Sequence, residues 1–273
     1  MQQGLGDRQV QVHLLAVPPE EDAATSARWA LDTAERERLA RLRRPADQWL
    51  YLCAHTLLRR VLSDCAPVSP PDWRFETGHA GKPALCRHHH PGLQSLRFNL
   101  SHCPGLVAVV VARGREVGVD VEHVDGLHDP AGLATMVLTP DEWRLWDQTE
   151  PSDLVRRHFL LERWTLKEAA LKAMGFGLGR IEPSRFGLMP ETGSAWRVLP
   201  FEGHPQPHVH WWVCTEPVDR PHRLAIAGER LQGEQLPALL VKHWTVDHLH
   251  PSRCTPCPSS ASVSSLAGNR QVA

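Results

Sequence analysis

Apolar residues recur along the chain with the periods of both strands and helices, which predicts a mixed α and β fold. The run at 106–112 is unbroken and apolar, as expected of a buried strand, and 11–17 is also rich in apolar residues. Further strands are predicted at 97–101, 117–125, 209–215 and 223–228. The fold class therefore includes sheets built from segments of both halves of the chain.

Helical periodicity begins in the first half of the chain. Between 33 and 62 it is interrupted at Pro45, which predicts a basic helix followed by a more apolar one. Another helix is predicted over 139–147, where Thr139 caps the first turn and Pro140 takes the first helical position. These signals set the starts of the helices more firmly than their ends.

The longest predicted helix covers 154–174 and stops at Gly175. It is apolar nearly all round, which predicts a buried helix. Glu168 and Lys172, four residues apart, share one side of it and form an ion pair in the simplest interpretation. Because a buried ion pair often stabilises less than apolar residues of the same volume, a cleft that holds a metal or a phosphate explains the two charges better.

Composition and charge exclude several classes of protein. The chain has 273 residues, of which 42% are hydrophobic, so it forms one large domain or two small ones. Its formal net charge is −1, so no global field attracts nucleic acid or an anionic membrane. No run approaches the roughly 20 apolar residues that span a bilayer, and the seven scattered cysteines are typical of reduced thiols. We expect a cytoplasmic protein with no membrane or nucleic-acid partner.

After about residue 250 the sequence is rich in serine and proline and nearly lacks large apolar residues. Such a segment cannot offset the entropy lost on ordering, so 251–273 is predicted to be a disordered tail. The tail contains Cys254 and Cys257, but a single Cys-x-x-Cys lacks the paired spacing of a structural zinc site. We assign zinc neither to the tail nor to the histidine run at 88–90.

Two carboxylates lie close together on the predicted strand at 117–125. Asp120 and Glu122 are two residues apart and share a face with Gly118, which leaves space beside them. Carboxylate oxygens suit magnesium or manganese. Taken alone, the pattern is more typical of a strand with a solvated acidic face, because acidic residues at period 2 are common in strands.

Candidate phosphate-binding residues precede that strand. Lys82 follows a glycine, and Ser101 and His102 follow the predicted strand at 97–101. Lysine, histidine and serine all donate hydrogen bonds to phosphate oxygens. Ordinary surface loops have the same composition, and the basic helix with Arg38 and Arg41 is by itself more typical of a solvated face.

Taken in order, these segments resemble the Sfp-type 4′-phosphopantetheinyl transferases. The family pattern is GKP, then FN-x-SH, then G-[VI]-D-[VI]-E, then W-x-x-KE-x-x-x-K-x-x-G. The chain matches it at 81–83, 98–102, 118–122 and 164–175, and the resemblance covers roughly residues 30–230. Four motifs in order are far more specific than any one of them.

The resemblance implies the fold, the reaction and the partners. The family fold is a single-chain α+β pseudodimer of two similar halves, each a small antiparallel sheet with a long helix, with the active site between them. Here the halves would be 1–113 and 114–250, with the boundary near 113–116. The expected reaction transfers the 4′-phosphopantetheine arm of coenzyme A to a serine of an apo acyl or peptidyl carrier protein and releases 3′,5′-ADP. The carriers serve fatty-acid, polyketide or nonribosomal-peptide synthesis, and a monomer is expected.

The resemblance also assigns roles to residues. Asp120, Glu122 and Glu168 would bind Mg²⁺ or Mn²⁺. Glu168 would activate the serine and Lys172 would stabilise the departing phosphate, which makes both catalytic. The expected contacts to coenzyme A are Arg38, Arg41, Lys82, Ser101, His102 and Lys172.

One position departs from the family. Many relatives have an arginine where this chain has Leu50, so Arg43, Arg44 or Arg59 would have to replace its contact to the nucleotide. Two other functions stay open. The same acids would serve a metal-dependent phosphodiesterase or nucleotidyl transferase that acts on a coenzyme A-like nucleotide. A non-enzymatic relative is disfavoured, because Asp120 and the other charged motif residues are all present.

Overall fold

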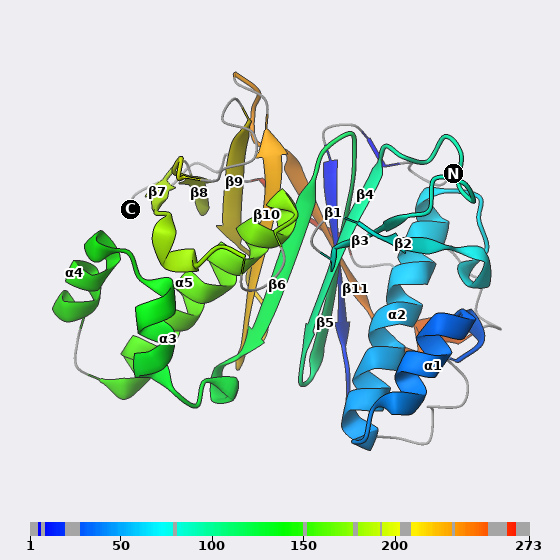
Figure 1. The fold of residues 1–273 in the computed structure, drawn as a ribbon, viewed down its shortest axis with the longest axis horizontal. Helices are drawn as coiled ribbons and strands as arrows, with labels where there is room; N and C mark the ends of the chain where they lie inside the picture. Colours follow the sequence, from blue (N-terminus) through cyan, green and yellow to red (C-terminus); the bar gives the residue numbers. More distant parts are fainter. Residues whose placement is uncertain are drawn as a thin grey trace. The chain divides into compact units, whose positions relative to one another are not determined.

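The computed structural model describes most of the chain and shows an α+β fold (Figure 1). The described residues are 5–6, 9–19, 28–78, 81–149, 152–176, 180–191, 193–202, 209–230, 233–250 and 261–265. They form two compact units that divide in the sequence between Gly114 and Arg115. The first unit also includes residues from 238 to 264, and the second includes Lys82. No helix in the described ranges is long and apolar enough to cross a membrane.

The first unit is a sheet covered by a long helix. Its strands are β1 (Gln9–Ala16), β2 (Phe75–Thr77), β3 (Pro83–Leu85), β4 (Leu96–Cys103), β5 (Leu106–Arg113), β11 (Ala238–Trp244) and β12 (Ala261–Ser265), and its helices are α1 (Thr33–Arg41) and α2 (Pro45–Cys65). The main sheet has the order β12-β11-β1-β5-β4, and β2 pairs with β3 apart from it. Helix α2 packs on β5 and β4 (Figure 1). Pro45 starts α2 rather than ending a helix, because its missing N–H is not needed in the first turn.

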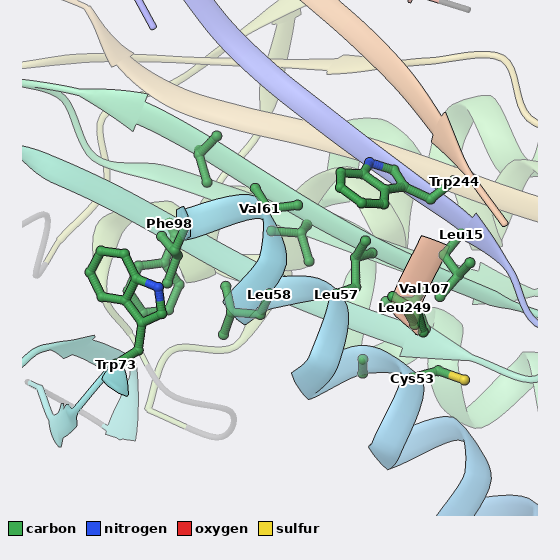
Figure 2. Close-up of a cluster of buried hydrophobic side chains, with 14 of the residues drawn as sticks. Leu15, Cys53, Leu57, Leu58, Val61, Trp73, Phe98, Val107, Trp244 and Leu249 are labelled. Carbon is green, nitrogen blue, oxygen red and sulfur yellow. The ribbon is translucent and has the colours of Figure 1, made fainter. Parts of the chain in front are cut away.

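A single apolar cluster holds this unit together. Leu57 and Val61 of α2 are fully buried, as are Val107 of β5 and Trp73. Figure 2 shows the α2 side chains directed at the sheet, with Trp244 of β11 in the same cluster. Residues far apart in the sequence thus share one core, and burial of these side chains is the main stabilising contribution.

Strand β11 corrects two expectations. Residues 238–250 were assigned to the second half, but β11 pairs with β1 of the first unit, Val12 opposite Val241. The pairing is parallel, whereas β1 and β5 are antiparallel, so this sheet is not the purely antiparallel sheet expected. The physical reason is that β5 pairs with only one edge of β1. The backbone N–H and C=O groups of the other edge still need partners, and β11 supplies them.

The tail expectation is also corrected in part. Residues 261–265 form β12, an edge strand next to β11, although 251–273 was predicted to be disordered. A strand at the edge is held by backbone hydrogen bonds, so it does not need large apolar side chains. The remainder of the tail, including Cys254 and Cys257, lies outside the described residues.

The second unit is likewise a five-stranded sheet with a long helix. Its strands are β6 (Val117–His123), β7 (Leu188–Pro190), β8 (Ala195–Val198), β9 (His210–Thr215) and β10 (His222–Arg230), and its helices are α3 (Pro130–Val137), α4 (Pro140–Gln148) and α5 (Asp153–Met174). The sheet order is β6-β10-β9-β8-β7, and α5 packs on β6, β10 and β9. Two predicted helix ends are confirmed: Thr139 caps α4, and α5 ends at Gly175, whose φ of +78° favours glycine.

Both units follow the same path along the chain. A first strand leads to a long helix and then to an antiparallel strand pair, and the last strand of that pair lies beside the first strand. In the first unit these elements are β1, α2, β4 and β5; in the second they are β6, α5, β9 and β10. The two units therefore share this chain path, and the expectation of a pseudodimer stays a prediction.

Candidate functional site

The site begins with an unusually close approach of β6 to α5. A Cβ placed on Gly118 would lie 2.2 Å from the Ala169 carbonyl oxygen and 2.4 Å from the Ala173 nitrogen. The space at Gly118 therefore belongs to the backbone of α5. This corrects the interpretation that the glycine makes room for a cation. The close packing brings the middle of α5, with Glu168 and Lys172, next to Asp120.

Three carboxylates and one lysine converge at this contact. Asp120 and Glu168 are buried, with exposed fractions of 4% and 5%. Lys172 Nζ donates to Asp120 Oδ1 at 2.6 Å. The pKa of Glu168 is raised to about 7, mainly by burial and also by the Asp120 and Glu122 carboxylates, while Lys172 opposes the shift. The sequence prediction that Glu168 is buried on the same side as Lys172 agrees with these contacts.

Glu122 lies at the more open end of the cluster. Trp164 Nε1 donates to Glu122 Oε1 at 2.8 Å, which fixes the direction of the carboxylate. Burial raises the pKa of Glu122, and the neighbouring Asp120 charge adds to the rise. Trp164 is part of a sequence motif, but its hydrogen bond to Glu122 on β6 can be found only from the tertiary structure.

The cluster has the donor chemistry of a hard-cation site but is not arranged as one. In the described part of the chain, no three His, Cys, Asp or Glu side chains are placed to hold a metal ion. Three carboxylates share one ammonium group, so two negative charges are unbalanced when all are ionised. A divalent cation with oxygen ligands would neutralise them. Ligation by Asp120 would require Lys172 to move, and the side chain of Lys172 reaches solvent with an exposed fraction of 25%.

Lys82 belongs to the same unit as the carboxylates. Its Nζ donates to Glu116 Oε2 at 2.9 Å, to the Val117 carbonyl at 3.0 Å and to the Ala173 carbonyl at 3.4 Å. These bonds join the start of β6 to the end of α5. The predicted contact of Lys82 with the nucleotide stays a prediction, since the structure shows this lysine engaged within the protein.

The other predicted phosphate contacts belong to the first unit. Ser101 is buried and His102 is exposed, on neighbouring positions of β4. Arg38 and Arg41 are exposed in the last turn of α1. Exposure leaves His102 and the two arginines accessible to a ligand, and their roles stay predictions.

Arg59 cannot replace the missing arginine at Leu50. Its side chain is fully buried and donates to Glu35 and Asp32, both at 2.8 Å. It also donates to the carbonyls of Pro70 and Trp73 at 2.9 and 3.0 Å. The guanidinium is thus saturated inside the first unit, and among the alternatives proposed from the sequence only Arg43 and Arg44 are exposed.

Sequence reasoning missed a second buried ion pair next to the site. Lys167 Nζ donates to Glu142 Oε2 at 2.5 Å and to the Val137 carbonyl at 2.7 Å, and its side chain is fully buried. Burial lowers the pKa of Lys167 to about 8, although Glu142 opposes the shift. Because Glu142 also closes the capping box with Thr139, the pair ties the start of α4 to the turn of α5 that carries Glu168. The only sign of this pair in the sequence is the capping pattern of Thr139 and Glu142, which places Glu142 in the first turn of α4.

Comparisons with known proteins match the two units to models that describe the same activity. The model of the 4′-phosphopantetheinyl transferase superfamily matches residues 116–227, and a model of a 4′-phosphopantetheinyl transferase N-terminal domain matches 18–114. The 4′-phosphopantetheinyl transferase HetI of Nostoc sp. is 30% identical, over 69% of this chain and 81% of the relative. A phosphopantetheinyl transferase of Thraustochytrium sp. is 32% identical over 63% of each chain. A solved holo-[acyl-carrier-protein] synthase of Thermotoga maritima is 25% identical over 43% of this chain and 64% of that one, with a TM-score of only 0.34.

Proposed function

Because this chain belongs to the 4′-phosphopantetheinyl transferase superfamily, we propose that it transfers the 4′-phosphopantetheine arm of coenzyme A to a serine of an apo acyl or peptidyl carrier protein. The serine Oγ forms a bond to the β-phosphorus, the bond from that phosphorus to the bridging oxygen breaks, and 3′,5′-ADP leaves. The observation that carries the proposal is the buried cluster of Asp120, Glu122, Glu168 and Lys172.

The residues of the cluster have distinct roles in this reaction. Asp120, Glu122 and Glu168 would hold Mg²⁺ or Mn²⁺, which supplies charge neutralisation at the pyrophosphate when it is bound. Glu168, which is buried next to Asp120, accepts the proton of the serine hydroxyl. Lys172, at the solvent-reaching side of Asp120, hydrogen-bonds the departing phosphate.

The contacts to coenzyme A are proposed for Arg38, Arg41, Lys82, Ser101 and His102. If Arg38 and Arg41 bind the 3′-phosphate, coenzyme A should bind at least tenfold more tightly than dephospho-coenzyme A, because charge-assisted hydrogen bonds to phosphate are strong. The preference should shrink in the Arg38→Ala/Arg41→Ala variant when both affinities are measured by calorimetry. Equal affinities in the parent protein would contradict this placement.

The activity itself is tested with coenzyme A, magnesium and a panel of apo carrier proteins, read by intact mass. The expected result is a carrier that gains one phosphopantetheine group, together with release of 3′,5′-ADP. Chelation of the metal should stop the transfer, and adding back magnesium or manganese should restore it. Release of 3′,5′-ADP without any carrier would instead indicate a phosphodiesterase, and no reaction with any carrier would contradict the proposal.

A further inference from the structure

Trp164 of α5 directs the one polar atom of its side chain at a proposed metal ligand. The indole Nε1 donates to Glu122 Oε1 at 2.8 Å, while the ring packs against the apolar cluster of α3, α4 and α5. A partly buried indole N–H needs an acceptor, and here the acceptor is a carboxylate, which forms a stronger hydrogen bond than a neutral group. This bond links a helix side chain to the carboxylate of a strand.

A second partner for Glu122 lies on the neighbouring strand. The register of β10 on β6 places Arg223 directly opposite Glu122. Side chains at such positions share one face of the sheet, with Cβ atoms about 4.5–5.5 Å apart, and opposite charges there attract each other. Among the described residues, Glu122 and Arg223 nevertheless form no ion pair. Arg223 Nη2 instead donates to His158 Nδ1 on α5, and its Nη1 donates to the His222 carbonyl oxygen at 3.1 Å.

The Glu122 carboxylate therefore has two directions open to it. Hydrogen-bonded to Trp164, it stays within range of the Asp120 and Glu168 carboxylates, and like charges repel each other there. Turned toward Arg223, it would gain a counter-charge instead. The repulsion favours Arg223, and the hydrogen bond from Trp164 opposes it. The indole N–H thus determines which partner Glu122 takes.

We propose that Trp164 is a positioning residue, which holds Glu122 beside Asp120 and Glu168 and away from Arg223 and so sets the affinity for the divalent cation. This inference rests on the metal site of the proposed function. Hydrogen bonds to a metal ligand from outside the coordination sphere fix the orientation of that ligand, and their loss typically weakens metal binding about tenfold to hundredfold. Trp164 acts only through Glu122 and takes no part in the transfer step itself.

The test is the affinity for Mg²⁺ and for Mn²⁺, measured by calorimetry without coenzyme A or a carrier protein. Trp164→Phe keeps an aromatic ring and removes the N–H donor, so the affinity should fall about tenfold to hundredfold. Trp164→Gln should lie between this variant and the parent, because its amide retains an N–H donor. A lower melting temperature with unchanged metal affinity in both variants would make Trp164 a packing residue only and overturn the inference.

Arg223→Met tests the competition for Glu122. In the parent it should change the metal affinity little, because Trp164 already holds the carboxylate. Combined with Trp164→Phe it should restore most of the lost affinity, since the competing partner is gone. The two changes are therefore expected to be strongly non-additive. Equal gains from Arg223→Met with and without Trp164 would show only the general effect of removing a positive charge and would overturn the competition.

Trp143→Phe is the matched control. Trp143 on α4 packs against the same apolar cluster as Trp164, and its ring lies against that of Trp146, with 6.2 Å between the ring centres. The variant should keep the parental metal affinity. A loss equal to that in Trp164→Phe would show a general effect of disturbing the aromatic side chains and overturn the role of the hydrogen bond.

Metal binding can be measured whether or not the protein transfers phosphopantetheine. If the parent binds the metal but transfers nothing, the proposed function fails, and the affinities of the Trp164 variants still support or overturn the inference. If the parent binds no divalent cation, or Asp120→Ala binds it equally well, the cation does not occupy this site. That result would overturn the inference even if transfer occurred.

Discussion

In the first unit the buried Arg59 is matched with partners on every side, whereas β6 and α5 of the second unit gather like charges. Arg59 of α2 is surrounded by two carboxylates, Asp32 and Glu35, and by two carbonyl oxygens. Glu35 also accepts a hydrogen bond from His55 Nδ1 at 2.8 Å. The donors of the Arg59 guanidinium all have acceptors there, so this network stabilises the fold and leaves none of them for a ligand.

On β6 and α5 of the second unit, negative charges outnumber positive ones. Asp120, Glu122 and Glu168 compete for one lysine, and burial with mutual repulsion raises the pKa values of Glu122 and Glu168. Such an arrangement destabilises the folded protein unless a cation or a ligand is bound. The same chain path thus carries a satisfied network in one unit and the carboxylate cluster proposed to bind a cation in the other.

The largest expected effect is on catalysis in the second unit. Asp120→Ala should reduce transfer at least a thousandfold, because it removes a carboxylate proposed to bind the metal and with it transition-state charge stabilisation. The fold should survive, since the change relieves repulsion among the carboxylates. Single-turnover transfer and thermal unfolding measure the two effects.

Asp125→Ala is the control for that change, because Asp125 follows β6 and its carboxylate is exposed. It should keep parental transfer. Magnesium-dependent transfer at the parental rate by a well-folded Asp120→Ala protein would contradict the metal assignment and the contrast between the units.

The next effect is on stability in the first unit. Arg59→Met should lower the free energy of unfolding by about 3–5 kcal/mol, because Asp32 and Glu35 lose their buried counter-charge. Lys172→Met in the second unit should lower the chemical rate and cost less stability, because the side chain of Lys172 reaches solvent whereas that of Arg59 is fully buried. Denaturant unfolding and single-turnover kinetics on both variants make the comparison. A larger stability loss in Lys172→Met than in Arg59→Met would reverse it.

A smaller effect concerns the contact of β6 with α5. Gly118→Ala should lower the free energy of unfolding by about 1–3 kcal/mol, because the new methyl group overlaps the backbone of α5 at Ala169 and Ala173. Transfer should fall as well, since α5 must shift with Glu168. Gly126→Ala is the control, as nothing lies within 4 Å of the added Cβ. Equal unfolding midpoints for both variants would show that the close approach is not required.

The sequence predicted the parts of this picture that depend on local patterns. Period-2 spacing placed Asp120 and Glu122 on one face, helical spacing placed Glu168 with Lys172, and Gly175 ended α5 as expected. These features are set by neighbouring residues, so a short stretch of sequence is enough to find them.

Features that depend on distant residues could not be predicted. The parallel pairing of β11 with β1 joins positions more than 220 residues apart, and nothing in the local pattern of either strand specifies the partner. Arg59 resembled a surface cation until its partners from α1 and the segment at 70–73 were known.

The smallest expected effect is a pH dependence of stability that arises in the first unit. His13 of β1 is fully buried, accepts a hydrogen bond from Trp244 Nε1 at its Nδ1 (2.9 Å) and donates from Nε2 to Gln11 Oε1 (3.3 Å). Burial, with a smaller contribution from Lys242, holds the pKa of His13 well below its ordinary value. The folded state therefore keeps a neutral ring, which suits the hydrogen bond from Trp244.

The direction of this pH dependence follows from proton binding to His13 in the folded and the unfolded protein. Below the ordinary histidine pKa of about 6.5 the unfolded chain binds a proton at His13 that the folded protein excludes, so stability is complete above this pH and falls below it by up to about 1.4 kcal/mol per pH unit. His13→Gln should remove this part of the slope when denaturant unfolding is measured between about pH 7.5 and 5. His128→Gln changes an exposed histidine and should keep the parental slope. If stability changed with pH equally in the parent and in His13→Gln, the first unit would tolerate a charge at this position. His13 would then no longer support the contrast between a first unit that excludes unmatched charge and a second unit that gathers it.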